Sequence, residues 1–276
     1  MATEEAHCQQ IWLMTEHSFR FTHAITRRPP RSAVHGLRAE DVGNPDVNRM
    51  TEHHDAYVEA LGHAGVEVVV LDALEEFPDS LFVEDTALCL REGAVVLRPG
   101  APTRFRESLA MEPHLRDLYS DVRVLSGPGF IEGGDILTSD SEILVGKSAR
   151  TNSEGIHELR DAVAGWGYAL REVTTPPGVL HFKSDCSLLD GTTILSTPRL
   201  SSSGCFEDYT VIDVAEGEEP AANSIRVNDV VFMPRGFPVT TGRVRDAGFD
   251  VVELDNSECQ KIDGGLSCLS LRFSPS

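Results

Sequence analysis

The feature that most constrains the fold is a loose internal repeat. Five stretches share one pattern, a short apolar segment followed by a bend that contains Pro, Gly or Lys. They are THAITRRPPRS from Thr22, AVVLRPGAPTR from Ala94, EILVGKSARTN from Glu142, TTILSTPRLSS from Thr192 and VVFMPRGFPVT from Val230. Repetition of this kind predicts similar units that bury their apolar faces against one another.

A second apolar strand accompanies each of these stretches and begins beside a polar or Gly-rich turn. These strands are LFVEDTALCL, GGDILTSD, KSDCSLLDG, AANSIRV and GGLSCLSLRF. The last of them lies at the C-terminus, residues 264–273, whereas its apparent partner THAIT lies near the N-terminus, residues 22–26. This order predicts that the two ends of the chain pair and close a ring.

Apolar residues at helical spacing predict helices over 50–65 and 151–167, and glycines end both segments. A further strand follows each helix, which makes a unit of strand, strand, helix and strand. We therefore expect an α/β fold with a single domain over 1–276, in which about five such units repeat around a central cavity in a propeller-like arrangement. The alternative is a doubly wound α/β sheet. The paired strands between helices and the absence of GxGxxG and GxxxxGK[ST] motifs count against that sheet.

The charge of the chain narrows the class of ligand. Forty-four acidic and 24 basic residues give a net charge of −20, which opposes nucleic-acid binding and suits a cationic ligand, although a solvated acidic surface explains the charge equally well. No run of about 18 apolar residues predicts a membrane span, and the acidic N-terminus does not resemble a secretory signal. We expect a cytoplasmic protein.

The cysteines do not suggest a disulfide framework or a metal site. There are six, at positions 8, 89, 186, 205, 259 and 268, and no two form a CxxC pair or take zinc-type spacing with histidine. This usage is typical of a reducing compartment.

Polar residues stand where the inner strands would begin, facing the expected cavity. They are Glu84 and Asp85 in FVEDT, Glu132 and Asp135 in IEGGD, His181 in LHFKSD and Cys268 in GGLSC. A thiol, an imidazole and carboxylates are the components of a nucleophilic Cys–His–carboxylate site. Each also has an ordinary explanation: Cys268 as a small buried apolar residue, the acidic pair as a solvated turn, and the Gly-Gly pairs as β-turns that use positive φ.

The motifs FPDSLFVEDTA, RPGAPTR, GGDIL, VGKSARTN, LHFKS, AAN and DGGLSC, in this order, resemble the dimethylarginine dimethylaminohydrolases of the guanidino-modifying, or pentein, superfamily. The resemblance extends from FTHAITR to GGLSCLSLRF and implies a five-bladed α/β propeller. It also implies a thiol hydrolase that converts asymmetric dimethylarginine and monomethylarginine to citrulline plus dimethylamine or methylamine, through a covalent Cys-thiouronium intermediate. The implied partner is this small-molecule substrate, with no nucleic acid or membrane, and homo-oligomerisation is left open.

The resemblance further implies a role for individual residues. Cys268 would attack the guanidinium carbon, His181 would transfer protons, and Glu132 would orient and charge the imidazole. The implied substrate-binding residues are Asp85 and Glu84 at the guanidinium, Asp79 and the Leu37 carbonyl at the α-ammonium, and Arg104 and Arg150 at the α-carboxylate. The segment from about 27 to 38 would be a lid, and its sequence here is unusually basic and Pro-rich.

Lys183 separates this chain from other members of the superfamily. Arginine and agmatine deiminases typically carry Asp two residues after the catalytic His, where this chain has Lys183. A carboxylate facing a dimethylated nitrogen would be left unpaired, so its absence favours methylated substrates. The alternative is that Lys183 points into solvent and has no part in selectivity. The alternative functions are an arginine or agmatine deiminase and a non-catalytic amino-acid-binding domain.

Overall fold

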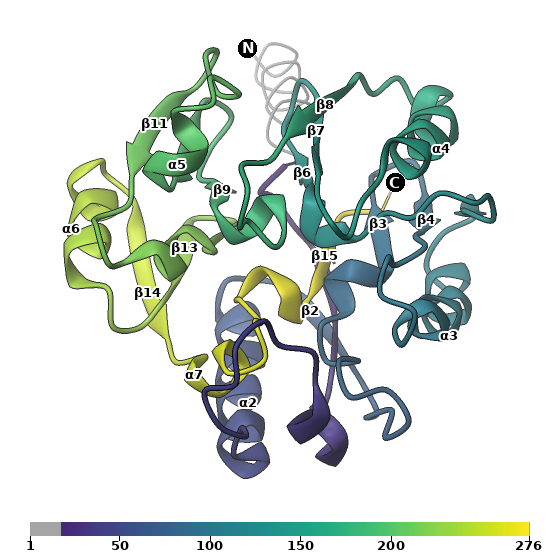
Figure 1. The fold of residues 1–276 in the computed structure, drawn as a ribbon, viewed down its shortest axis with the longest axis horizontal. Helices are drawn as coiled ribbons and strands as arrows, with labels where there is room; N and C mark the ends of the chain where they lie inside the picture. The colour runs from purple at the N-terminus through teal and green to yellow at the C-terminus, as the bar shows by residue number, and fades with distance from the viewer. Residues whose placement is uncertain (1–17, 276) are drawn as a thin grey trace, which may run out of the picture.

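The computed structural model describes residues 18–275, and the strands in this range form five three-stranded sheets. In sheet order these are β15 (Leu271–Phe273), β1 (His23–Arg27) and β2 (Glu67–Leu71); β3 (Ala87–Cys89), β4 (Ala94–Val96) and β5 (Val122–Val124); β6 (Ile136–Thr138), β7 (Ile143–Lys147) and β8 (Leu170–Thr174); β9 (Cys186–Leu188), β10 (Thr193–Ser196) and β11 (Thr210–Asp213); β12 (Ile225–Val227), β13 (Val230–Pro234) and β14 (Asp250–Leu254). Every sheet has one antiparallel and one parallel pair around its middle strand. Figure 1 shows the sheets arranged around a common centre.

Helices join the middle strand of each sheet to its outer strand and lie at the periphery (Figure 1). They are α2 (Val47–His63), α3 (Phe105–Arg116), α4 (Ser153–Ala164), α5 (Pro198–Ser201) and α6 (Pro238–Asp246), and a short α7 (Ser257–Gln260) precedes the C-terminal segment. The side chains of Asp46 and Asn152 accept backbone N–H bonds at the starts of α2 and α4, which explains where these helices begin. Both helices expected from the sequence are confirmed, although α2 begins three residues earlier than expected.

The two ends of the described chain pair, as the sequence predicts. Strand β1 runs antiparallel to β15, with His23 opposite Phe273 and Ile25 opposite Leu271. The first sheet therefore takes its inner strand from the C-terminus and its other two strands from the N-terminal part of the chain. Because residues about 250 positions apart complete one sheet, that sheet cannot form until the chain is complete.

The hydrophobic core is divided into five clusters, and each cluster joins two consecutive sheets. Ile25 shares a cluster with Val96, Leu88 with Val145, and Leu144 with Ile194, so the clusters connect the first four sheets in order. The fourth and fifth sheets meet through a cluster that includes Leu195 and Met233. The fifth and first sheets meet through a cluster that includes Ala24, Tyr57 and Phe232. Each sheet thus buries both of its faces against neighbouring sheets, which explains why the strand segments of the repeat are apolar.

The inner strands are shorter than the sequence predicts. A turn of 3₁₀ helix forms within two residues of the start of each of them, over Val83–Thr86, Gly133–Asp135, Phe182–Ser184, Glu219–Ala222 and Ser267–Leu269. The expectation that Glu84, Asp85, Asp135 and Cys268 begin strands is therefore wrong, because these residues lie in the turns. Gly, Asp, Asn and Ser favour local backbone bonding over an extended strand, which accounts for the difference.

Side chains connect these five turns into a closed ring of hydrogen bonds. Each bond joins one turn, or the residue that follows it, to the next turn in chain order, and the last bond returns to the first turn. The bonds run from Gly134 N–H to Asp85 Oδ1 (2.8 Å), from Phe182 N–H to Asp135 Oδ1 (2.8 Å), from Asn223 Nδ2 to the Lys183 carbonyl (3.0 Å), from Ser267 N–H to Asn223 Oδ1 (2.9 Å) and from Ser267 Oγ to Glu84 Oε2 (2.7 Å).

Close packing at the ring explains the two Gly-Gly pairs. A Cβ atom on Gly133 would lie 1.9 Å from the Glu84 carbonyl oxygen, and one on Gly265 would lie 2.2 Å from the Asn223 side chain. Neither these glycines nor their neighbours Gly134 and Gly264 are among the positive-φ residues. The interpretation of the pairs as turns that need positive φ is therefore wrong, and absence of a side chain is what these positions require.

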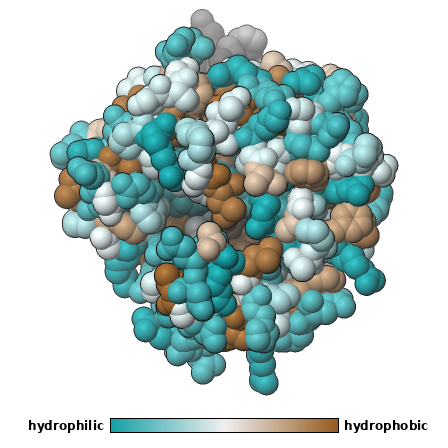
Figure 2. All heavy atoms as spheres, in the orientation of Figure 1, coloured by the Kyte–Doolittle hydropathy of each residue, from teal (hydrophilic) through white to brown (hydrophobic). Residues whose placement is uncertain are grey.

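The surface is mainly hydrophilic, in keeping with the acidic composition. Figure 2 shows hydrophilic residues over most of one face, with apolar residues scattered among them. Within residues 18–275, no helix has the length and apolar character needed to cross a membrane. The cysteines at positions 89, 186, 205, 259 and 268 are free thiols, and Cys8 lies outside the described residues.

Replacing Asn223 by Ala should destabilise the ring. The substitution removes the acceptor for Ser267 N–H and the donor to the Lys183 carbonyl, both in a buried position. A buried unsatisfied group costs about 1–3 kcal/mol, so the free energy of unfolding should fall by at least that amount. Urea denaturation measures the change, with Asn48→Ala on the exposed face of α2 as the matched control. Equal stability of the two variants would contradict a structural role for the ring.

Candidate active site

His181 and Glu132 form a buried ion pair at the centre of the molecule. The distance from His181 Nε2 to Glu132 Oε2 is 2.6 Å, and the two residues are 8% and 0% exposed. Each directly precedes a 3₁₀ turn, so two neighbours in the ring of turns bring them together. The structure thus brings these two predicted site residues into contact.

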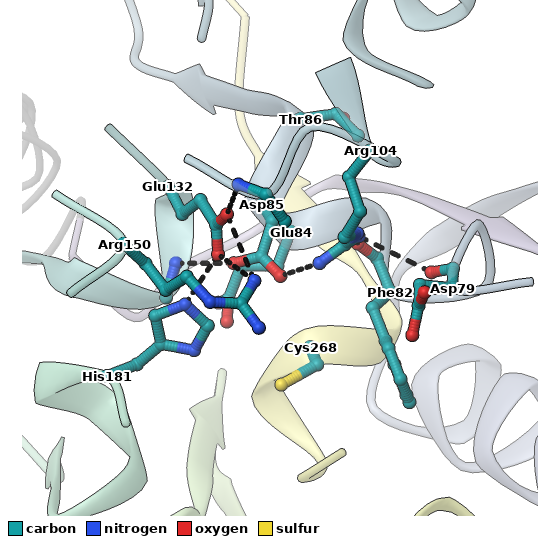
Figure 3. Close-up of polar contacts among 12 residues, drawn as sticks. Asp79, Phe82, Glu84, Asp85, Thr86, Arg104, Glu132, Arg150, His181 and Cys268 are labelled. Atoms are coloured by element: carbon teal, nitrogen blue, oxygen red, sulfur yellow. Dashed lines mark hydrogen bonds and ion pairs between the residues drawn. The ribbon is translucent and has the colours of Figure 1, made fainter. Parts of the chain in front are cut away.

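The RPGAPTR segment holds the Glu132 carboxylate from the other side. Its Oε1 atom accepts hydrogen bonds from the Gly100 and Ala101 N–H groups at 3.0 and 3.2 Å. The Arg150 guanidinium lies 3.3 Å from the same oxygen and is partly exposed. Figure 3 shows the Arg150 and His181 side chains on one side of this carboxylate, directed toward the space that Cys268 also enters. Glu132 is consequently fixed in orientation before any ligand arrives.

These contacts set the charges of the pair. Burial lowers the pKa of His181, but Asp85 and the hydrogen bond with Glu132 raise it to about 9. Burial disfavours the Glu132 anion, yet His181, Arg104 and Arg150 lower the pKa of the carboxyl to about 2. At neutral pH the site therefore holds an imidazolium and a carboxylate, and His181 has a proton to donate.

Cys268 reaches the same space from the C-terminal segment (Figure 3). Its Sγ atom accepts a hydrogen bond from Gly265 N–H at 3.4 Å, and the residue is 8% exposed. Burial and the negative charges of Glu84 and Asp85 raise the pKa of the thiol to about 12, although the Gly265 N–H and Lys183 oppose the shift. Cys268 is therefore a neutral thiol until positive charge comes close to it.

Asp85 faces this space and is paired with Arg104. Arg104 Nη1 donates to Asp85 Oδ2 at 2.5 Å, and both residues are buried. Arg104 is also held by Glu107, whose Oε2 accepts from Nε at 3.0 Å and from Nη2 at 2.9 Å. Nη2 donates in addition to the carbonyls of Asp79 and Phe82. The guanidinium of Arg104 thus has internal partners on every nitrogen.

Glu107 is the buried group that the sequence analysis missed. It lies three residues after Arg104 in the first turn of α3, and burial raises the pKa of its carboxyl to about 7 even though Arg104 opposes the shift. Its second oxygen, Oε1, has no hydrogen-bond partner within residues 18–275. The spacing of Arg and Glu at i and i+3 at a helix start is the signal that could have identified this pair.

Asp79 and Leu37 are brought together at the edge of the site. The Leu37 N–H donates to Asp79 Oδ1 at 2.9 Å, and burial raises the pKa of this carboxyl. Leu37 follows a short 3₁₀ helix, Arg31–His35, within the segment expected to be a lid. The Glu75 carboxylate accepts the N–H groups of Arg31 and Ser32 and so anchors that helix. The segment therefore packs over the acidic edge that Asp79 forms.

Glu84 binds a different set of side chains from its neighbour Asp85. Lys183 Nζ lies 2.6 Å from Glu84 Oε1, and Arg272 Nη2 lies 3.0 Å from the same oxygen. The Ser267 hydroxyl donates to Oε2. The alternative that Lys183 points into solvent is wrong, because Glu84 binds its ammonium group in a mostly buried position.

Asp85, Glu132 and His181 could in principle share a metal ion. One ligand-type atom from each lies within 4.8 Å of the others, and all three are buried. In this structure the Arg104 and Arg150 guanidinium groups and the imidazole itself already contact these carboxylates. The cationic side chains thus take the place that a divalent cation would need.

Comparisons with known proteins place this geometry in a family. A family model described as N,N dimethylarginine dimethylhydrolase, eukaryotic, matches residues 43–176. A dimethylarginine dimethylaminohydrolase from Pseudomonas aeruginosa is 39% identical over 92% of this chain and 100% of the relative. One from Streptomyces coelicolor is 34% identical over 91% of this chain and 96% of the relative. The chain belongs to the dimethylarginine dimethylaminohydrolase family.

Solved structures of the dimethylarginine dimethylaminohydrolase family share the fold. A cysteine-to-serine mutant of the Pseudomonas aeruginosa enzyme complexed with citrulline superposes with a TM-score of 0.90, at 39% identity, over 92% of this chain and 100% of that chain. The N-terminal domain of ArgZ, a cyanobacterial arginine dihydrolase, superposes with a TM-score of 0.80 at 19% identity over 92% of this chain and 98% of that chain. The second likeness shows the fold alone, and it extends that fold beyond the dimethylarginine dimethylaminohydrolase family.

Replacing Glu132 by Gln should lower the pKa of His181 below about 9. The amide keeps the shape of the side chain but removes the negative charge that stabilises the imidazolium. Titration of the His181 ring by NMR measures the shift, with Glu154→Gln on the exposed start of α4 as the control. A His181 pKa that stays the same in Glu132→Gln would contradict the pairing described above.

Proposed function

We propose that the protein is a thiol hydrolase that converts asymmetric dimethylarginine and monomethylarginine to citrulline plus dimethylamine or methylamine. The observation that carries the proposal is that four buried side chains face one space beside the ring of turns: Cys268, His181, Glu132 and Asp85. Membership of the dimethylarginine dimethylaminohydrolase family supports it, because relatives with that name match over nearly the whole chain.

A methylated guanidinium suits the charges of the site. The carboxylates of Asp85 and Glu132 attract a cation, and Cys268 is a neutral thiol without one. A guanidinium bound beside the sulfur would lower the pKa of the thiol, so the substrate itself would promote formation of the thiolate. The nucleophile would then form only when there is a substrate to attack, which spares a reactive thiolate in the resting protein.

The chemistry would proceed in two stages. With the guanidinium bound, the Cys268 thiol gives its proton to solvent. The sulfur attacks the guanidinium carbon, an S–C bond forms, and the His181 imidazolium gives its proton to the methylated nitrogen as the C–N bond breaks. Dimethylamine or methylamine leaves and takes up a proton from solvent, and a thiouronium remains on Cys268. Neutral His181 then removes a proton from water, and the oxygen attacks the same carbon. The S–C bond breaks, the hydroxyl proton of the adduct passes to the leaving sulfur, and citrulline is released with the Cys268 thiol and the His181 imidazolium restored. No metal or organic cofactor takes part in this sequence.

The remaining residues would bind the amino-acid end of the substrate. Asp79 and the Leu37 carbonyl would meet the α-ammonium, and Arg150, which is partly exposed, would meet the α-carboxylate. We assign the same role to Arg104, whose Nη1 would exchange Asp85 for the substrate carboxylate while Glu107 holds its other nitrogens. The guanidinium of the substrate would in turn take the place that Nη1 leaves on Asp85. The segment from about 27 to 38 would act as the lid.

The architecture would be a single catalytic domain with a five-bladed α/β propeller fold. Support comes from the five core clusters, which connect consecutive sheets and join the fifth to the first. We also propose a cytoplasmic location, because the described cysteines are free thiols and the mechanism needs one of them reduced. A homo-oligomer would be compatible with this fold.

Cys268→Ser should lower citrulline production from dimethylarginine by about 10³-fold or more, because a serine hydroxyl provides no accessible anion near neutral pH. Citrulline assays on the purified protein measure the loss. Cys205→Ser, which changes another buried free thiol in a different core cluster, should retain parental activity. If Cys268→Ser kept the parental rate, neither the nucleophile nor the covalent mechanism could stand.

Asymmetric dimethylarginine and monomethylarginine should be turned over with a higher kcat/KM than arginine, by roughly tenfold. Lys183, Arg272 and Ser267 occupy Glu84, so Asp85 is the carboxylate of this acidic pair left to meet the guanidinium. An arginine-specific site would need a carboxylate at the other edge, which a dimethylated nitrogen would leave unpaired at a cost of about 1–3 kcal/mol. Side-by-side kinetics decide the matter. If arginine were the best of the three substrates, the protein would be a deiminase.

A further inference from the structure

A large cavity lies behind the active site, on the other side of Glu84. It has a volume of about 1260 Å³ and is lined by parts of the inner strands of all five sheets. Glu84, Lys183 and Ser267 belong to its lining, whereas Asp85, Glu132, His181 and Cys268 do not. Glu84, Lys183 and Ser267 therefore lie between two spaces. The proposed reaction takes place in one of them, and no step of the mechanism uses the other.

The charge of this cavity is opposite to that of the whole chain. Among residues 18–275 its lining includes five basic residues and one acidic residue, in a protein with 24 basic and 44 acidic residues. The basic residues are Arg20, Arg91, Lys183, Arg226 and Arg272, and the acidic one is Glu84. Arg20 pairs with Asp229 near the protein surface. The net charge that a ligand would meet is therefore decided at the inner end of the cavity, around Glu84.

The inner end carries an excess of positive charge. Lys183 and Arg272 both contact Glu84 Oε1, at 2.6 and 3.0 Å, and their side chains are only 12% exposed. Two cations thus share one carboxylate, and the Ser267 hydroxyl satisfies its second oxygen. The neighbouring carboxylate, Asp85, is taken by Arg104 on the active-site side. A partly buried cation in excess attracts an anion strongly, because little water is present to solvate it.

The cavity also offers a hydrogen-bond donor with nothing to bind. The hydroxyl of Ser187, in β9, is buried and has no partner within residues 18–275, although the residue is only 4% exposed. Ser187 belongs to the same lining as Lys183 and Arg272. A buried polar group without a partner is uncommon and points to a ligand or a solvent molecule.

We propose that this cavity is a binding site for a small anion, a carboxylate or a phosphate, held by Lys183 and Arg272 beside Glu84, with Ser187 of the same lining as a further donor. The two cations fit this chemistry. Lys183 is a compact charge with several donors, and Arg272 adds a second charge, although its Nη1 already donates to the Ser267 and Ser270 carbonyls. The lining does not include Asp85, Glu132, His181 or Cys268, so the site is separate from the proposed methylarginine site.

Titration of inorganic phosphate into the full chain tests the proposal. Isothermal titration calorimetry at constant ionic strength should show saturable binding of one phosphate per chain. Lys183→Met should weaken that binding by about tenfold or more, the loss of one charge-assisted hydrogen bond. The matched control is Lys261→Met, which removes a lysine that pairs with Glu258 at 2.7 Å outside the cavity and should leave phosphate affinity unchanged.

Two further variants and a second anion test the same proposal. Ser187→Ala removes the unpartnered hydroxyl at no cost to any bond, so it should fold normally and weaken phosphate binding severalfold even if Lys183→Met fails to fold. Arg150→Ala should have no effect, because Arg150 lies on the active-site side. A parallel titration with acetate tells a carboxylate site from a phosphate site. The proposal is overturned if neither anion binds saturably, if Lys261→Met weakens binding as much as Lys183→Met, or if Arg150→Ala alone abolishes it.

Discussion

The ring of hydrogen bonds between the five 3₁₀ turns is the interaction on which the rest of the structure depends. Repeated sheets that pack face to face are held by apolar contacts, which are non-directional and tolerate small shifts. The bonds from Asp85, Asp135 and Asn223 to the backbone of neighbouring turns are directional and leave little freedom. Because His181 and Cys268 lie directly beside these bonded residues, the ring fixes their relative position.

The ring also divides the interior into two electrostatic environments. Glu84 and Asp85 are adjacent in sequence, yet one pairs with Lys183 and Arg272 and the other with Arg104. The 3₁₀ turn directs these two consecutive side chains to different partners. The negative side suits a guanidinium, and the positive side suits an anion. Two spaces of opposite charge can coexist near the centre because these buried ion pairs stand between them.

The sequence was sufficient to predict the repeat and insufficient to predict its details. The pairing of THAIT with the C-terminal strand and the helices α2 and α4 follow from apolar periodicity, which tertiary contacts reinforce. The 3₁₀ turns could not be foreseen, because a three-residue turn has no period of its own. The Gly-Gly pairs were misread for a related reason: a glycine needed for space looks the same in sequence as one needed for positive φ.

Site residues were predictable to the extent that their chemistry is distinctive. A Cys, a His and carboxylates lie at equivalent places in different repeats, and together they predict one shared site. Of these residues, Glu132 and His181 form an ion pair. Glu107 had no such distinction, since its importance comes from burial and from the arginine beside it. The same holds for the excess of positive charge behind Glu84, which arises from residues 183 and 272 on different repeats. Charge balance at a buried point depends on which side chains converge there, and convergence is a property of the closed ring as a whole.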